Sequence, residues 1–415
     1  VNGPVGTSTS AKDLLTLDSK TSVTVDATAI TDISGTVAEI NKLLAADVDV
    51  DATAVNYDLS GTVKAADAST IASKTLGVVT ANNIAADTAA NLDANLRDSN
   101  GGANVYKLTV NGATASAANL ASLATKANAS AANTIKVDAK EITGTSAELN
   151  TLYTTDKANY SNIGNKNVKI SGVANITDLN TILAATSGIV TATVGTADAT
   201  TLKGITGATT GKDALTLVTN DSAASADDLL TLDAMTSVKV NATAITTNGI
   251  NGTAAQLKQL VAAKGVELAK AVAITVTGAT NASDLAAILK ATTGIVTATV
   301  TADTAAKLNA ALKDANNGDV LTLRVNDTTA TAKDLISLDG KTSVAIVVNV
   351  GAITGNITEL TNVFVVNKTN FNGEENAAVT ISGTVTAAEA NTIANAANGV
   401  VTATVKADTA ANLVS

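Results

Sequence analysis

A long internal repeat constrains this chain more than any other feature of its sequence. The matched leucines of four similar segments are separated by 106, 109 and 106 residues: Leu14, Leu120, Leu229 and Leu335. Four glycines keep nearly the same step: Gly77, Gly188, Gly294 and Gly399. A period held over a whole chain is typical of repeat architectures. The sequence therefore predicts one continuous solenoid over residues 1–415, with long repeats at 1–108, 109–217, 218–323 and 324–415.

Each long repeat divides into about four shorter strand–helix units of roughly 25 to 30 residues, a length typical of solenoid rungs. Residues 294–325 show the pattern clearly. Valine and alanine alternate with threonine over 296–300, which predicts a strand. Leu308 and Leu312 follow at helical spacing, and a turn sequence at 316–318 precedes the next strand, 320–325. Nearly every other part of the chain is a variant of this unit.

The expected helices begin with residues that can cap them. Three pairs fit the capping box, in which two side chains satisfy reciprocal backbone donors: Thr36 with Glu39, Thr253 with Gln256, and Thr386 with Glu389. The helical bodies at 38–46, 282–291 and 304–312 are about ten residues long. Helices of that length are unstable alone, so packing must hold them.

The expected strands alternate with these helices along the chain. They lie at 22–25, 190–194, 237–240, 273–278, 296–300, 379–383 and 401–405. Alternating strands and helices predict parallel strands joined by right-handed crossovers. We therefore expect an α/β fold: a right-handed strand–helix solenoid with one long parallel sheet flanked by short helices. A β-solenoid with short corner helices is the alternative.

The composition predicts a thin core of small side chains. Hydrophobic residues make up 46% of the chain, but aromatic residues only 1%. Alanine, valine, leucine and isoleucine suit a narrow, uniform core better than a large globular one. The residues expected to form this core or to carry assembly are Val1, Leu92, Leu96, Leu308, Leu312 and Leu413.

Charge and missing residue types exclude several classes of function. The formal net charge is −10, and Arg97 and Arg324 are the only arginines. An acidic chain without basic clusters is a poor ligand for nucleic acid, and its apolar runs are too short for membrane insertion. Cysteine and histidine are both absent, so thiolate chemistry and a Ser–His pair are excluded. We predict that the protein is not an enzyme.

Asp47, Asp49 and Asp51 are the strongest metal-ligand candidates in the sequence. They place three carboxylates on one side of a strand-like stretch. An EF-hand calcium loop would require glycine and glutamate where Ala52 and Asp58 stand. We expect no cofactor and a solvated acidic segment here, with calcium as the weaker alternative.

Two resemblances add to this interpretation. The V-x-V stretch, the I-x-x-I corner and the helix within residues 22–44 resemble leucine-rich repeats in layout, although Thr28 and Thr243 replace their usual Asn or Cys. The segments LTLDSKTSV, ITGTSAELNTLY and ISGTVAEINKLL resemble the repeats of giant surface proteins of marine cyanobacteria, including a motility-associated type. That resemblance implies a structural protein outside the cell or on its surface.

The sequence thus predicts a non-enzymatic structural repeat protein that forms an extracellular or cell-surface fibre or layer. Both ends align with interior points of the repeat, which predicts head-to-tail stacking with copies of itself or a longer chain. The alternative is an adhesin that contacts glycans or another cell surface through an exposed face. The insertions at 153–167 and 366–376 are the expected places for such a lateral contact.

Overall fold

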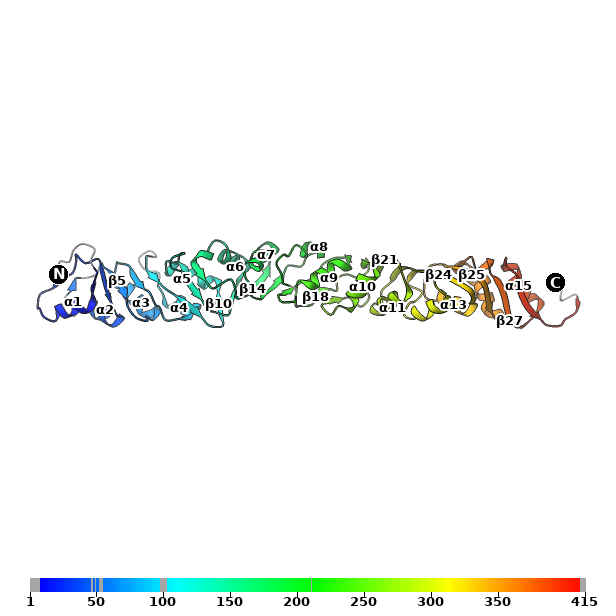
Figure 1. Cartoon of the computed structure of the whole chain (residues 1–415), viewed down its shortest axis with the longest axis horizontal. Helices are drawn as coiled ribbons and strands as arrows, with labels where there is room; N and C mark the ends of the chain where they lie inside the picture. The colour runs from blue at the N-terminus through cyan, green and yellow to red at the C-terminus, as the bar shows by residue number, and fades with distance from the viewer. Residues whose placement is uncertain are drawn as a thin grey trace. The chain divides into compact units, whose positions relative to one another are not determined.

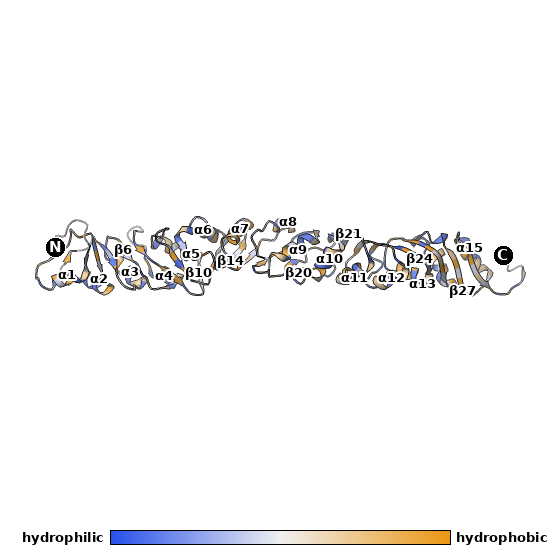
Figure 2. Cartoon of the chain, viewed as in Figure 1, coloured by the Kyte–Doolittle hydropathy of each residue, from blue (hydrophilic) through white to orange (hydrophobic). Residues whose placement is uncertain are grey.

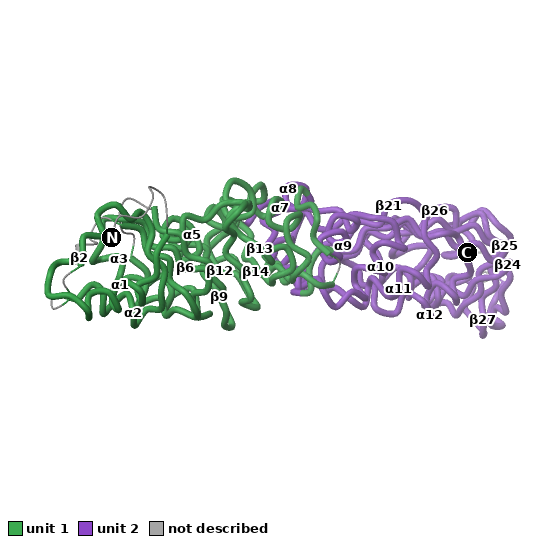
Figure 3. The backbone as a smooth tube through the Cα atoms, turned by 60° about the vertical axis from the view of Figure 1, so that its left-hand side comes forward, with its two compact units in different colours: residues 1–195, 204–216, 235–237 green, residues 196–203, 217–234, 238–415 purple. Residues whose placement is uncertain are grey.

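The computed structural model describes residues 8–45, 48, 50–51, 55–97, 103–209 and 211–410, apart from the side chain of Asp51. The chain divides into two compact units (Figure 3). Unit 1 comprises residues 1–195, 204–216 and 235–237, and unit 2 comprises 196–203, 217–234 and 238–415. Both units are mixed α/β structures in which short helices alternate with parallel strands (Figure 1).

Fifteen α-helices lie within the described residues. Unit 1 contains α1 (Ala11–Asp18), α2 (Val37–Leu43), α3 (Ala65–Ala72), α4 (Ala89–Asn95), α5 (Ala117–Lys126), α6 (Ser146–Tyr153) and α7 (Ile176–Ala185). Unit 2 contains α8 (Ala199–Leu202), α9 (Ala226–Ala234), α10 (Ala254–Ala262), α11 (Ala282–Ala291), α12 (Ala305–Ala311), α13 (Ala332–Asp339), α14 (Ile357–Thr361) and α15 (Ala387–Ala396).

Side-chain caps start these helices where the sequence predicts. The boxes at Thr36, Thr253 and Thr386 are confirmed, because both reciprocal hydrogen bonds are present in each. Two further boxes, not predicted, occur at Thr145 with Glu148 and at Asn356 with Glu359. Since each cap satisfies a free amide of the first turn, the helix starts are set locally by sequence.

Unit 1 has two five-stranded parallel sheets whose strands follow in sequence order. The first consists of β1 (Ser8–Ser10), β3 (Asp32–Gly35), β5 (Asn56–Leu59), β6 (Val79–Ala81) and β8 (Val105–Tyr106). The second consists of β10 (Thr114–Ser116), β12 (Glu141–Thr145), β14 (Asn167–Ala174), β15 (Val190–Val194) and β16 (Ala214–Thr216).

Unit 2 repeats this arrangement. One sheet consists of β17 (Ala224–Ser225), β19 (Ile250–Gly252), β21 (Ile274–Thr280), β22 (Val296–Val300) and β23 (Val320–Thr322). The other consists of β24 (Arg324–Thr331), β25 (Ile346–Gly355), β27 (Ala378–Val385) and β28 (Val401–Val405), with β26 (Phe371–Asn372) pairing β25. Residues that pair across neighbouring strands lie about one strand–helix unit apart in the sequence, as Thr297 and Val320 do.

The strands form several parallel sheets, where the sequence predicted one long sheet. In unit 1, the chain passes from β8 to β10 without an intervening helix. It turns at Gly112, whose φ of +103° places it in the left-handed region that favours glycine. The turn leads into β10, which opens the second sheet. The expected parallel pairing is correct, but the sheet is interrupted where one long repeat meets the next.

A second set of short strands was only partly predicted. It comprises β7 (Asp87–Thr88), β9 (Thr109–Asn111), β11 (Ile135–Val137) and β13 (Tyr160–Ser161), together with the pairs β2 (Val25–Asp26) with β4 (Val50–Asp51) and β18 (Val240–Ala242) with β20 (Val266–Leu268). The strands expected at 22–25 and 237–240 overlap this set at Val25 and Val240 only. Thr28 and Thr243 cap the following corner, since each donates to the residue two before it, Asp26 or Asn241.

The core consists mainly of small aliphatic side chains. Leu92, Leu96, Leu308 and Leu312 are all buried in it. Hydrophobic and hydrophilic residues are interleaved along both units (Figure 2). None of the described helices combines the length and hydrophobicity needed to cross a membrane.

Candidate functional site at the contacts between rungs

We call one strand with its following helix a rung, and the described contacts between successive rungs form the most regular feature of the chain. We call the turn between a helix and the next strand a corner. At one type of corner, a threonine side chain forms a hydrogen bond with the backbone of the preceding rung. Thr292 Oγ1 donates to the carbonyl oxygen of Val272 at 2.5 Å and accepts from the Gly294 amide at 2.9 Å. Thr75 and Thr186 make the same two bonds, to Val55 and Lys166 and from Gly77 and Gly188. We call these residues corner threonines.

The glycine of each corner lies against the backbone of the preceding rung. A Cβ atom on Gly188 would lie 2.0 Å from the Lys166 carbonyl oxygen. The corresponding distances to a carbonyl oxygen are 2.1 Å at Gly77, 2.5 Å at Gly294 and 2.1 Å at Gly399. These are the four glycines whose spacing marks the long repeat. Their recurrence has a steric cause, because a side chain at any of them would separate the rungs.

At a second type of corner, one threonine hydroxyl bonds to both backbone groups of a strand residue, in the place of a neighbouring strand. Thr342 Oγ1 donates to the Leu321 carbonyl oxygen at 2.8 Å and accepts from the Leu321 amide at 3.0 Å. Thr236 makes the same pair of bonds to Leu215, at 2.7 and 2.9 Å. All four residues are buried. The hydroxyl therefore satisfies both backbone groups of a residue that water does not reach.

Replacing Thr342 by valine is expected to lower the free energy of unfolding by about 1–3 kcal/mol, because it leaves the amide and carbonyl of Leu321 buried without this partner. Valine has nearly the same shape, so packing is preserved. Thr342→Ser keeps the hydroxyl and serves as the control, with a smaller expected loss. Denaturant unfolding of the three proteins measures the difference. Equal stability of the valine and serine variants would contradict this role of the hydroxyl.

Buried polar side chains recur beside the corners. Asp213 and Asp319 are 2% and 1% exposed, and their Oδ1 atoms each accept from a strand amide of the preceding rung, Val190 or Val296, at 2.8 Å. Asn104 plays the same part for Val79, also at 2.8 Å. Each side chain thus accepts a hydrogen bond from a strand amide that is buried, and this bond explains why a polar residue is tolerated there.

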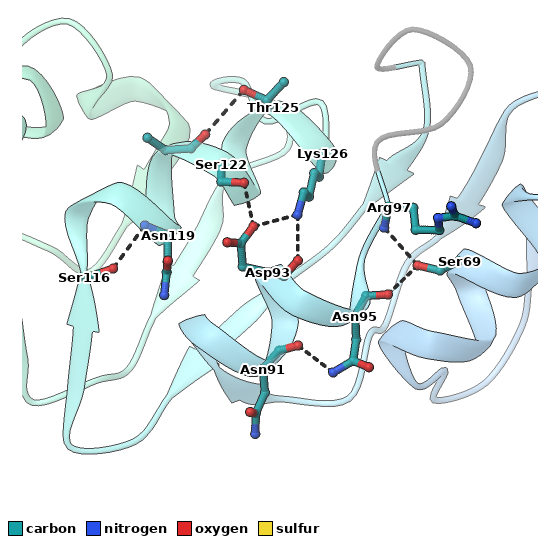
Figure 4. A network of polar contacts seen from close by, with 11 residues as sticks. Ser69, Asn91, Asp93, Asn95, Arg97, Ser116, Asn119, Ser122, Thr125 and Lys126 are labelled. Atoms are coloured by element: carbon teal, nitrogen blue, oxygen red, sulfur yellow. Dashed lines mark hydrogen bonds and ion pairs between the residues drawn. The ribbon is translucent and has the colours of Figure 1, made fainter.

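Polar contacts also join the helices of neighbouring rungs, as Figure 4 shows for unit 1. Asp93 at the end of α4 accepts from Ser122 at 2.5 Å and Lys126 at 2.7 Å, both on α5. On the other side, Ser69 of α3 donates to the Asn95 carbonyl oxygen at 2.6 Å and accepts from the Arg97 amide at 3.0 Å. Burial alone would raise the pKa of Asp93, but the bonds from Lys126 and Ser122 outweigh it and lower that pKa.

Two ion pairs occupy related positions in unit 2. Lys203 pairs with Asp228, and Lys258 pairs with Asp284. The hydrogen bond from each lysine is the largest cause that lowers the pKa of its aspartate. The stabilisation is therefore present above the ordinary carboxyl pKa and is lost as pH falls through the lowered value. Because the pairs are partly exposed, we expect it to be small.

The remaining sequence candidates are only partly placed. Asp47 and Asp49, like Val1 and Leu413, lie outside the described residues. Asp51 ends β4, where its backbone pairs with Asp26, but its side chain is not described. Within the described part of the chain, no group of three or more acidic, histidine or cysteine side chains could hold a metal ion.

Sequence reasoning missed the corners, although their signal is visible in the sequence. Thr-x-Gly occurs at 75–77, 186–188 and 292–294, and Thr-Ser-Val occurs at 236–238 and 342–344. Threonine is common in strands, so its presence here was explained by strand propensity alone. Its hydroxyl also bonds to the backbone of the preceding rung. These hydrogen bonds hold the backbones of successive rungs in register.

Comparison with known proteins identifies no family: no protein-family model matches the chain, and no curated protein is significantly similar to it.

Proposed function

We propose that the protein is a non-enzymatic structural repeat protein, a strand–helix solenoid whose copies stack head to tail into an extracellular or cell-surface fibre or layer. The observation that carries this proposal is a comparison of three strands with the same sequence. β15, β22 and β28 all read Val-Thr-Ala-Thr-Val. The first two are flanked by strands on both sides, whereas β28 pairs with β27 alone among the described strands.

The environment of the inward-facing side chains differs accordingly. In β22, Val296, Ala298 and Val300 are buried. In β28, the equivalent Val401 and Ala403 are half-buried, and Val405 is 39% exposed. The same residues thus lack the cover that a further rung provides elsewhere. An additional rung would remove this apolar surface from water and pair the open backbone edge of β28.

In this proposal, a second copy of this chain supplies that rung. In this proposal the partner edge is β1, the first described strand of its sheet, which pairs with β3. Contact between two different edges is heterologous, so repetition produces an open filament unless the assembly closes into a ring. Such a junction would be of a new kind, because within the chain the strands equivalent to β1, namely β10, β17 and β24, each open a new sheet.

Sedimentation velocity on the full chain tests this proposal. We expect species larger than the 41.0 kDa monomer that increase with protein concentration. Ala403→Lys places a charge on the inward side of β28 and should shift the population to monomer. Thr402→Lys adds the same charge on the exposed side of the same strand and is the matched control, which should still assemble. A wild-type chain that stays monomeric, or equal loss of assembly in both variants, would defeat the proposal.

A further inference from the structure

The two insertions predicted from the sequence form equivalent structures, one in each unit. An offset of 211 residues aligns them without gaps, and it pairs Tyr153 with Phe364 and Tyr160 with Phe371. Each insertion contains a short 3-10 helix, Lys157–Asn159 or Lys368–Asn370, followed by a two-residue strand, β13 or β26. Each residue of the second insertion can therefore be compared with the residue at the equivalent position of the first.

One interior position differs sharply in chemistry between the two insertions. Ile163, 4% exposed, fills it in unit 1, and Glu374, 1% exposed, fills the equivalent position in unit 2. The Oε2 atom of Glu374 has no hydrogen-bond partner among the described residues. A carboxyl group thus occupies a place that suits isoleucine, where its charged form is strongly disfavoured.

Two charged side chains act on Glu374, namely Glu375 and Lys368. Glu375 Oε2 accepts from the Gly373 amide at 3.1 Å, and the Glu375 carboxyl shares a hydrogen bond with Glu374. β25, which packs against this turn, carries no titratable side chain. Burial raises the pKa of Glu374 most, and neighbouring Glu375 raises it further, whereas a backbone hydrogen bond to Glu374 and the more weakly acting Lys368 lower it.

The outer side of the second insertion is also reversed in polarity. Thr154 and Thr155 of the first insertion bond to backbone carbonyl oxygens of α6. Their equivalents, Val365 and Val366, are 46% and 68% exposed. The second insertion therefore has a polar group inside and apolar groups outside, the opposite of the first. A buried carboxyl and exposed valines both make the closed conformation of this segment less favourable.

We propose that Glu374 is a proton-controlled latch: residues 366–376 stay closed against β25 while its carboxyl is neutral, and loss of the proton drives the carboxylate into water and opens the segment. The step is an acid dissociation, in which the proton passes to solvent. Opening frees the backbone bonds that close the turn, from Asn376 to the Gly373 carbonyl oxygen and from Ala377 to that of Glu374.

The direction of the pH dependence follows from the raised pKa. The closed segment keeps a proton that the open segment has already released. The latch therefore contributes fully below the ordinary glutamate pKa, and its contribution is lost as pH rises through the raised value. This is opposite to the pH dependence of the Lys–Asp pairs between helices.

Hydrogen exchange of the full chain, measured by mass spectrometry across pH and corrected for intrinsic exchange rates, tests the latch. We expect the opening constant of residues 373–377 to rise by up to about tenfold per pH unit, the limit for one proton. The equivalent residues 162–166 should show no such rise. Glu374→Gln and Glu374→Ile should abolish the dependence, and Ile163→Glu should introduce it in unit 1.

Three results would overturn the proposal. The first is wild-type protection at 373–377 that does not change with pH. The second is a pH dependence that persists in both Glu374 variants, which would assign it to another group. The third is a Glu374 carboxyl signal in carbon NMR that titrates at or below the ordinary glutamate value while the segment stays protected.

Discussion

Gly188→Ala is expected to destabilise unit 1 by about 3 kcal/mol, the upper part of the range for an overpacked site. A Cβ atom there would lie 2.0 Å from the Lys166 carbonyl oxygen, far inside the contact distance of the two atoms. The obstructing atom belongs to the backbone, so no side chain can rotate away. The rungs must separate, and the bond of Thr186 to Lys166, 2.6 Å long, must lengthen or break.

Gly164→Ala is the matched control, because it makes the same change in the same unit at an open position. The nearest heavy atom to its Cβ would be the Ala185 carbonyl oxygen at 3.6 Å, an ordinary contact. We expect its stability to change by about 1 kcal/mol or less. Thermal or denaturant unfolding compares the two variants. Similar stabilities would show that the corner absorbs a methyl group and that rung spacing is not set there.

Leu308→Ala is expected to cost about 2–4 kcal/mol, the usual range for truncating a fully buried leucine. Its helix, α12, packs against α13 and β24 of the following rung. Because contacts run chiefly between successive rungs, we expect the loss to remain near α12. Stacked repeats behave as chains of nearest-neighbour interactions rather than as one cooperative core.

Hydrogen exchange resolves where the stability is lost. Protection should fall in α12 and in the rungs on either side, and it should persist in distant parts of unit 2. Ile295→Ala, which truncates a half-exposed side chain in the preceding segment, should cost under about 1 kcal/mol and serves as the control. A single cooperative loss of protection throughout unit 2 after Leu308→Ala would argue for a globular core.

The sequence predicts the helices well because their determinants are local. Thr253 and Gln256 bond to each other's backbone, so the start of α10 can be recognised without knowledge of its neighbours. Strands with strong alternation were equally clear: 296–300 and 401–405 are strands with the predicted bounds. Both kinds of element express their pattern within one short segment.

The contacts between rungs could not be predicted in the same way, since they join residues about twenty positions apart. Thr342 reads as a strand former in the sequence, and only the position of Leu321 reveals its bonding role. Asp319 resembles an ordinary turn residue until its bond to the Val296 amide is seen. Glu374 reads as a surface glutamate, and comparison with Ile163 is what identifies it as buried in an apolar position.

The corner contacts have a consequence for how such a chain evolves. Thr236 and Thr342 bond to the main-chain amides and carbonyl oxygens of Leu215 and Leu321, across the boundaries between long repeats. These bonds therefore do not depend on the side chains of Leu215 and Leu321. Exchange of whole repeats of about 106 residues would preserve these backbone bonds. Side-chain contacts that cross the same boundaries, such as Asp93 with Lys126 and Lys203 with Asp228, would have to be matched again after such an exchange.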